Sequence, residues 1–367
     1  MCRPARDHGL QRMTNDPIQT GRNEMLHTTL KSLTAGVFAA TCAFASSATA
    51  QDTVLKYSSW FPESHSTNTV LKAWIEDVEA ATEGRVTVEY LPKTVQTPRD
   101  QFDVVVDGLA DIVIVLPGYT PGRFPVLEIG ELPLLVSTDE ATLAPAFYTL
   151  YETEIAPAEP FKGAQVLTTW ASAPTHIATK PGPITSMEQM KGLKIRAPSA
   201  TAGLVVDAMG AVTVQKPVTE IYELASSGIV DGTFFSYGPM ISWKTKDIFQ
   251  NVTVMPGGMG QSVIAVLMNQ GKFDSLSEAD RTAIMEVSGE KLARAFGAAW
   301  QNDEDVALAD LGNLTVVEAS DEFLAEFKQA IEPVEAAWVE KAKAAGLADP
   351  ASTLANFRAL LEAAQTN

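Results

Sequence analysis

The stretch KGLKIRAP, Lys191–Pro198, contains a short strand that ends on an arginine and is stopped by a proline. A short helix is predicted before it at Met187–Met190 and a longer one after it at Thr201–Met209, followed by a strand at Val212–Val214. Strands that alternate with helices indicate a parallel-rich α/β sheet. Ligands of such open sheets bind beyond the carboxyl ends of the strands, which is the position of Arg196.

The same alternation covers the chain from residue 54 onwards. Further strands are predicted at Val54–Ser58, Val86–Leu91, Ile112–Leu116, Val166–Trp170, Gly232–Tyr237 and Val263–Met268, and helices at Asn68–Thr82, Arg99–Asp107, Ala141–Glu154, Glu220–Ser226, Glu322–Ala345 and Ser352–Ala364. Ser275 and Glu278 form a capping-box pattern that predicts a long helical stretch towards Asp310. Leu116–Pro133 is dense in Pro and Gly, which predicts a loop.

Composition and charge exclude several classes of function. The chain has 367 residues, 46% of them hydrophobic and 20% charged, which is the composition of a folded globular protein with room for two α/β units. The formal net charge of −18 argues against a nucleic-acid partner, because binding to phosphates needs clustered Lys and Arg. It argues equally against docking on anionic lipid.

Residues 1–50 are predicted to be an N-terminal extension plus a signal peptide. Lys31 precedes the uncharged apolar run Leu33–Ser46, and the small residues up to Ala50 predict cleavage after that position. Met25 is a plausible true start. The run is shorter than the roughly 20 apolar residues of a membrane-spanning helix, and no other segment approaches that length. The mature chain is therefore expected to be periplasmic and not inserted in a membrane.

Removal of this leader would change the net charge and the cysteine content of the mature chain. The leader holds five basic and three acidic residues, so the net charge would move from −18 to −20. Both cysteines, Cys2 and Cys42, are lost with it, which leaves no thiol and no disulfide. A lipid anchor on Cys42 is the weaker alternative, because Thr41 is a poor residue before a lipidated cysteine.

Motifs for catalysis are scarce. Beyond residue 50 the only histidines are His65 and His176, and the chain has no H-E-x-x-H, G-x-S-x-G, Walker A or G-x-G-x-x-G motif. No catalytic residue, no metal site and no cofactor is therefore predicted. A pair of carboxylates acting as in glycosidases stays open, because an acidic chain offers many of them.

Arg196 is the candidate for ligand binding that the strand pattern itself provides. A guanidinium is a planar fork that can bind a carboxylate through two hydrogen bonds, and each charge-assisted bond contributes about 1.5–3 kcal/mol. The alternative is a surface arginine paired with one of the many carboxylates of the chain.

Several motifs together resemble the extracytoplasmic solute-binding subunits of TRAP transporters, the DctP-like family. The matching segments are Lys56–Ser58, Val88–Pro92, Asp107–Asp111, Glu131–Pro133, Gly192–Ala200, Glu220–Tyr222 and Gly228–Gly232, in the order of the family. The resemblance covers residues 51–367. It implies a small organic acid as ligand and delivery to a permease of two membrane subunits, driven by a sodium gradient.

The resemblance also implies an architecture. Two α/β lobes would be joined by a hinge, with a long helix spanning both and the ligand closed between them. Residues 51–174 and 261–302 are expected to form lobe I, and residues 175–260 and 303–367 lobe II.

Three residues take their roles from this resemblance. Arg196 matches the family's carboxylate-binding arginine. His176 stands where many relatives have a second arginine, so it is either a donor to the ligand or a structural histidine at the hinge. Phe235 occupies the position of an asparagine in members that bind sugar acids or dicarboxylates, and keto-acid members carry a metal-binding glutamate in this region. The phenylalanine puts both kinds of ligand site in doubt and suits an apolar or aromatic carboxylate.

Aromatic residues at strand ends complete the candidate site. Trp60, Phe61 and Trp170 end strands that face the same cleft in this fold, although a tryptophan is more often part of the core. Tyr237 and Trp243 are further candidates. The sequence thus predicts a periplasmic binding protein for a small monocarboxylate with an apolar or aromatic body. The alternatives are a secreted hydrolase or lyase on a two-lobed scaffold, and a binding protein that feeds a sensor.

Overall fold

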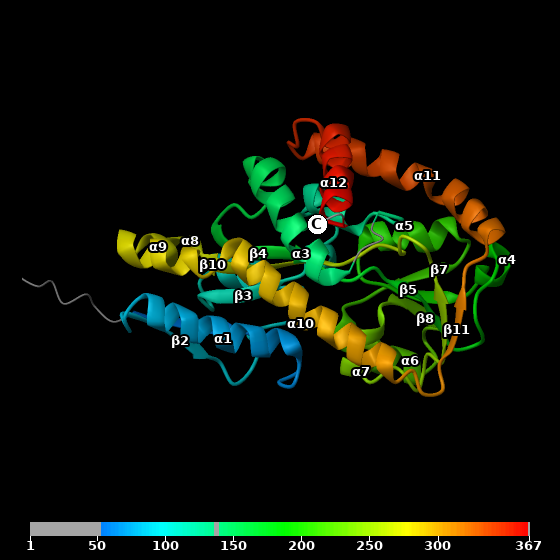
Figure 1. Ribbon diagram of the computed structural model, residues 1–367, viewed down its shortest axis with the longest axis horizontal. Coiled ribbons are helices and arrows are strands. Elements are labelled where there is room, and N and C mark those ends of the chain that lie inside the picture. The colour runs from blue at the N-terminus through cyan, green and yellow to red at the C-terminus, as the bar shows by residue number, and fades with distance from the viewer. Residues whose placement is uncertain (1–52, 136–138, 366–367) are drawn as a thin grey trace, which may run out of the picture. The chain divides into compact units, whose positions relative to one another are not determined.

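The strands form two separate sheets in the residues that the computed structural model describes, 53–135 and 139–365 (Figure 1). The first sheet has the order β2 (Val86–Tyr90), β1 (Thr53–Ser58), β3 (Ile112–Val115), β10 (Val263–Asn269), β4 (Ala164–Ala171). The second has the order β11 (Thr315–Glu318), β9 (Asn251–Val254), β5 (His176–Thr179), β8 (Gly232–Phe235), β6 (Lys194–Ala197), β7 (Val212–Gln215). The predicted leader and its cleavage after Ala50 lie outside the described residues.

The first sheet is built around two fully apolar strands. β3 reads IVIV and is buried throughout, and β10 is buried over all but its last residue. Strands covered on both faces take such continuous apolar runs. β1 is parallel to β2 and β3, whereas β10 lies between β3 and β4 and is antiparallel to both. The sheet is therefore mixed, and a late strand of the chain returns to its centre.

The second sheet places the predicted strand around Arg196 at an inner position. This strand is β6, which is parallel to β7 on one side and to β8 on the other. β5 lies antiparallel between β8 and β9. The short strands β5, β9 and β11 did not follow from the sequence pattern. Each has only four residues, and pairing with a neighbouring strand, not local propensity, decides their conformation.

The helices follow the predicted alternation closely. They are α1 (Ser66–Ala81), α2 (Gln101–Val106), α3 (Glu140–Leu150), α4 (Met187–Met190), α5 (Ala200–Ala208), α6 (Ile221–Ser226), α7 (Tyr237–Ser242), α8 (Gln270–Asp274), α9 (Glu278–Glu286), α10 (Gly289–Ala309), α11 (Asp321–Ala344) and α12 (Pro350–Gln365). The expected loop at Leu116–Pro133 also contains short 3₁₀ turns at Pro117–Tyr119 and Pro125–Glu131. The predicted strand at Gly232–Tyr237 was too long. It ends at Phe235, and α7 follows with Pro239 in its first turn, where proline is tolerated.

The prediction of one long helical stretch from the capping box was wrong in detail. Ser277, not Ser275, caps α9, and its hydroxyl accepts a hydrogen bond from the backbone of Asp280. The stretch is then interrupted before α10. Gly289 has a positive φ of 58°, and a Cβ at this position would lie 2.8 Å from the hydroxyl of Tyr148. The turn between the two helices therefore needs glycine.

Helix α10 links the two sheets. It packs against α1, α3 and β4 along part of its length and against α7 elsewhere, as Figure 1 shows. Gly297 permits the close approach to α3, because a Cβ there would lie 2.8 Å from the carbonyl oxygen of Glu140 and from Ala144 Cβ. The helix spanning both lobes that the sequence led us to expect is α10.

The two C-terminal helices pack against different parts of the protein. α11 packs against α4, α5 and the turn at Pro125–Glu131, whereas α12 packs against α3. The predicted lobe boundaries at 174/175, 260/261 and 302/303 stay a prediction. Among the described residues, no helix combines the length and the apolar character needed to cross a membrane.

Candidate functional site

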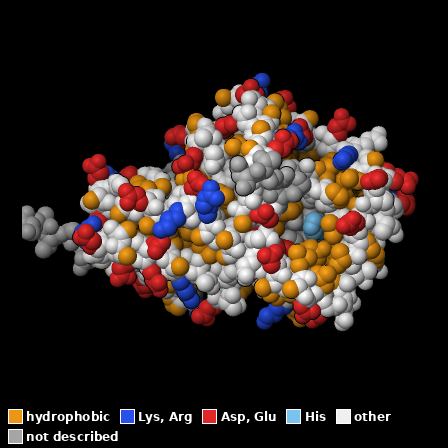
Figure 2. Space-filling view, viewed as in Figure 1, with side chains coloured by type: hydrophobic (Ala, Val, Ile, Leu, Met, Phe, Trp, Pro, Cys, Tyr) orange, Lys and Arg blue, Asp and Glu red, His pale blue; other side chains and the backbone are white. Residues whose placement is uncertain are grey.

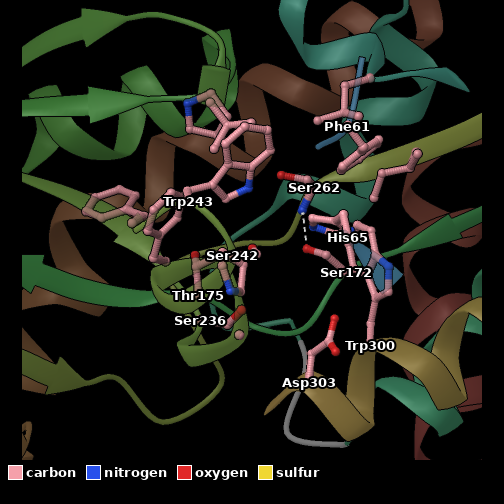
Figure 3. A pocket seen from close by; sticks show the side chains of 18 of the residues that line it. Phe61, His65, Ser172, Thr175, Ser236, Ser242, Trp243, Ser262, Trp300 and Asp303 are labelled. Atoms are coloured by element: carbon pink, nitrogen blue, oxygen red, sulfur yellow. Dashed lines mark hydrogen bonds between the residues drawn. The ribbon is translucent and has the colours of Figure 1, made fainter. Parts of the chain in front are cut away.

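Both sheets contribute to one cavity, which holds about 720 Å³ of space free of protein atoms, part of it open to solvent (Figure 3). Trp60 follows β1 of the first sheet, while Arg196 and Phe235 end strands of the second sheet. Trp300 and Asp303 reach the cavity from α10.

The guanidinium of Arg196 is buried and incompletely bonded. The side chain is only 2% exposed, and its Nε donates to the carbonyl of Lys216 at 2.8 Å. Its Nη2 has no hydrogen-bond partner among the residues that the structure describes. Burial lowers the pKa of Arg196, although the nearby Tyr119 hydroxyl and Glu220 favour the charged form. Arginine remains protonated in proteins, so the cavity contains a buried positive charge.

No protein carboxylate forms an ion pair with this charge within the described ranges. Glu220, the carboxylate that acts on it, is itself paired with Lys216 at 2.8 Å. A buried charge without a paired counter-ion costs free energy, which a carboxylate from outside the protein would recover. The geometry thus suits Arg196 to the anionic group of a ligand.

Aromatic rings from distant parts of the chain form the walls. Trp60 stacks on Phe61 with ring centroids 4.0 Å apart, and it lies 6.4 Å from the nearly parallel ring of Trp243. Trp60 Nε1 donates to the carbonyl of Ile114 at 3.0 Å, which fixes the indole. The ring of Phe235 faces the Arg196 guanidinium at 5.9 Å. Flat apolar walls beside a cation favour a ligand with a planar ring and a carboxylate.

Three of the predicted site residues lie away from this cavity's lining. Trp170 is fully buried and stacks on Phe296, with centroids 3.9 Å apart and planes at 5°. His176 Nδ1 accepts from the backbone of Met255 at 3.4 Å, and its ring lies 5.9 Å from that of Tyr237. Burial lowers the pKa of His176 to about 4, so it is neutral at pH 7. Ligand contacts for Trp170, His176 and Tyr237 stay a prediction.

The cavity also contains residues that the sequence did not single out. His65 caps α1, where its Nδ1 accepts from the backbone of Thr67, and burial lowers its pKa to about 4. Its place in the loop after β1, close to Trp60, was the available signal. Trp300 on α10 had no such signal, because only the packing of that helix brings it to the cavity.

Three carboxyl groups form the acidic part of the lining. Glu304 accepts from the backbone of Tyr237 and of Gly238, each at 2.8 Å, and Asp303 accepts from the Ser66 hydroxyl at 2.5 Å. Oε1 of Glu140 has no hydrogen-bond partner in the described part of the chain. Burial is the main cause that raises the pKa of all three groups, most of all that of Glu140. These residues are not arranged as a metal site, and the described part of the chain contains no group of three or more metal-ligating side chains.

Two mixed sheets that enclose a cavity with a buried, unpaired arginine define a two-lobed ligand-binding protein. This chain belongs to the bacterial extracellular solute-binding proteins, family 7 (DctP), whose pattern matches residues 57–342. That family is one of solute-binding receptors and not of enzymes, and it acts outside the cytoplasm.

Solved structures of TRAP solute-binding proteins are similar over most of the chain. One from Bordetella bronchiseptica, with bound (R)- and (S)-mandelate, is 34% identical with a TM-score of 0.80, covering 86% of this chain and 100% of that one. A marine metagenome protein specific for aromatic acid ligands, in complex with 3-hydroxybenzoate, is 33% identical with a TM-score of 0.77, covering 85% and 98%. One from Rhodoferax ferrireducens, with benzoate, is 26% identical with a TM-score of 0.77, covering 86% and 99%.

Proposed function

We propose that this protein captures a small aromatic monocarboxylate between its two lobes and delivers it to the membrane subunits of a TRAP transporter. The observation that carries the proposal is the buried guanidinium of Arg196, whose Nη2 has no partner, in a cavity walled by Trp60, Phe235 and Trp243. The similar proteins that hold mandelate, 3-hydroxybenzoate and benzoate support the same ligand class.

Local charge, not net charge, determines this preference for an anion. The chain carries a net charge of −18, and acidic side chains are spread over the face shown in Figure 2. Exposed charges farther away than about 8–10 Å are largely screened at physiological ionic strength. The guanidinium of Arg196 is instead buried beside the cavity, where the effective dielectric is low and its attraction for a carboxylate is strong.

Closure of the lobes would follow from contacts on both sides of the cavity. Trp60 comes from the first sheet, and Trp243 follows α7 next to the second. A ligand that touches both groups of residues only in the closed state shifts the equilibrium towards that state. Binding and closure are thus one coupled event, and the closed form is the one offered to the permease.

Catalysis plays no part in this proposal. A secreted hydrolase or lyase would need an activated nucleophile or base in the cavity. The histidine that lines it, His65, is neutral at pH 7 and has its Nδ1 engaged with the backbone of Thr67. A binding protein that feeds a sensor would use the same cavity, and it differs only in the membrane partner.

The location and the lobe limits belong to the same proposal. Export to the periplasm would use the leader at residues 1–50, with cleavage after Ala50 and Met25 as the start. Lobe I would comprise 51–174 and 261–302, and lobe II 175–260 and 303–367. N-terminal sequencing of the protein recovered from the periplasm tests the cleavage site.

A thermal-shift screen of the exported protein tests the ligand class. The set contains benzoate, a dicarboxylate such as succinate, and a neutral sugar such as glucose. An aromatic acid at about 100 times its dissociation constant should add roughly 2.7 kcal/mol of stability, whereas glucose should add nothing. A shift with glucose and none with any carboxylate would overturn the proposal.

A further inference from the structure

A second unpartnered polar atom lies in the cavity besides Arg196 Nη2. It is Oε1 of Glu140, the first residue of α3, whose side chain is only 1% exposed and lines the cavity. Within the described ranges no hydrogen bond reaches this oxygen. A buried polar atom without a partner destabilises the fold, which makes it an unusual feature of a folded protein.

The carboxyl groups around Glu140 are already satisfied by the protein. Glu304 is held by two backbone N–H groups at the start of α7, and Asp303 by Ser66. Their negative charges and above all burial raise the pKa of Glu140 well above its usual value. Glu140 is thus a buried carboxyl group beside two other acidic side chains, and it presents a free oxygen to whatever occupies the cavity.

This acidic group is separate from the Arg196 end. Arg196 lies on β6 of the second sheet, whereas Glu140 begins α3 and both Asp303 and Glu304 lie on α10. The direction from Arg196 to the acidic group follows strand β8. Thr233 pairs with Arg196, Phe235 follows two positions later, and the backbone N–H groups of Tyr237 and Gly238, just beyond it, donate to Glu304. A planar ligand that places its carboxylate at Arg196 and its ring along Phe235 thus points its far edge towards the acidic group.

Resting on the function proposed above, we propose that the cavity selects aromatic monocarboxylates that carry a hydrogen-bond donor on the ring, a hydroxyl or amino group, with Glu140 as its acceptor. A donor finds a free oxygen there, whereas an unsubstituted ring leaves that oxygen unpaired. An ether at the same place has no hydrogen to donate to that oxygen. A second carboxylate meets three acidic side chains, so aromatic dicarboxylates are rejected.

Titration calorimetry with the exported protein tests this selectivity. The ligands are benzoate, 3- and 4-hydroxybenzoate, the two matching methoxybenzoates, and isophthalate and terephthalate. At least one hydroxybenzoate should bind about ten- to hundredfold more tightly than its methoxy counterpart, because a hydrogen bond to a buried acceptor separates them. Isophthalate and terephthalate should bind more weakly than benzoate.

Variants assign the preference to Glu140. Glu140→Leu, of similar size, should remove the hydroxyl preference, whereas Glu140→Gln, which keeps an oxygen acceptor, should retain most of it. Glu188→Leu, an exposed glutamate on α4, is the control and should behave as wild type. If Glu140→Leu does not fold, the Gln variant and the wild-type series still decide the question.

The outcomes separate this inference from the function on which it rests. Equal affinity for hydroxy and methoxy acids in the wild type, or an unchanged preference in Glu140→Leu, overturns the role of Glu140 while aromatic-acid binding stands. Failure of every aromatic acid to bind overturns the proposed function, and with it this inference.

Discussion

The guanidinium carbon of Arg196 lies 5.9 Å from the centre of the Phe235 ring, so that a cation and an aromatic face border the same part of the cavity. The two residues come from β6 and β8, which are neighbours in the second sheet. A carboxylate bound in front of the guanidinium would have its attached ring directed along the phenylalanine. The pair can therefore contact both parts of an aromatic acid, its carboxylate and its ring.

Arg196→Ala should reduce the affinity for benzoate by at least about a hundredfold, because two charge-assisted hydrogen bonds are lost. Arg196→Lys should bind with intermediate affinity, since a lysine keeps the charge but not the planar fork. Calorimetric titration measures both. The control is Arg294→Ala on α10, an exposed arginine paired with Glu290. Unchanged affinity in Arg196→Ala would refute the assignment of the carboxylate site.

Trp243→Ala should accelerate ligand release more than it slows binding. The Trp243 ring lies 6.4 Å from the ring of Trp60 and lines the same cavity, so we expect its loss to weaken the closed state, which affects dissociation most. Trp243→Phe keeps a ring, so its rate of ligand dissociation should lie between those of Trp243→Ala and the wild type. Stopped-flow kinetics supply both rates, with Tyr222→Ala, an exposed residue of α6, as the control. A slower association with an unchanged dissociation rate contradicts the closure role.

Trp170→Ala should destabilise the protein without ligand by about 3–5 kcal/mol, because the indole is fully buried against Phe296. Trp170→Phe should cost less, since it retains a stacked ring. Urea unfolding of the ligand-free protein measures the loss. A normal midpoint combined with weakened aromatic-acid binding would instead return Trp170 to the ligand site.

Glu131→Gln should flatten the pH dependence of stability between about pH 5 and pH 8. Burial and the neighbouring charge of Glu128 raise the pKa of Glu131 to about 8, above the value of about 4.3 expected in the unfolded chain. The protonated form favours folding at low pH, and this contribution, on the order of a few kcal/mol, is lost as the pH rises towards 8.

Urea midpoints at pH 5, 6.5 and 8 measure this effect. The wild type should lose stability over this range relative to Glu131→Gln, whose amide stays neutral throughout. Glu335→Gln, a half-exposed glutamate of α11 that pairs with Arg358, is the control. Parallel curves for wild type and Glu131→Gln would contradict the raised pKa.

The sequence predicted the elements whose conformation is decided locally. β3 and β10 have apolar runs that favour buried strands. The strand that contains Arg196 is followed by Pro198, which ends it. The strands β5 and β9 have no comparable pattern. They exist because β8 pairs with β5 and β5 pairs with β9, which is information that no short window of sequence contains.

The same distinction explains what could be predicted of the site. Arg196 and Trp60 follow from their positions at the ends of strands, because strand ends meet at one edge of a sheet. Glu140 and Trp300 depend on how α3 packs against α10, where Gly297 lets the two helices approach. A position at the end of a strand does not by itself place a side chain in the cavity lining. Trp170 has such a position, but its side chain points to α10 and stacks on Phe296.

Three of the six tryptophans in the chain, Trp60, Trp243 and Trp300, line the cavity. Indole fluorescence responds to the polarity and the stacking partners around the ring, so occupancy of the cavity should alter the emission of the protein without any added dye. Trp74 and Trp338 are buried elsewhere and supply a constant background, whereas the ring of Trp170 lies 5.7 Å from that of Trp300. The intrinsic fluorescence of the protein should therefore report ligand binding. Candidate acids in a multiwell plate can be ranked by the change in tryptophan emission that each causes.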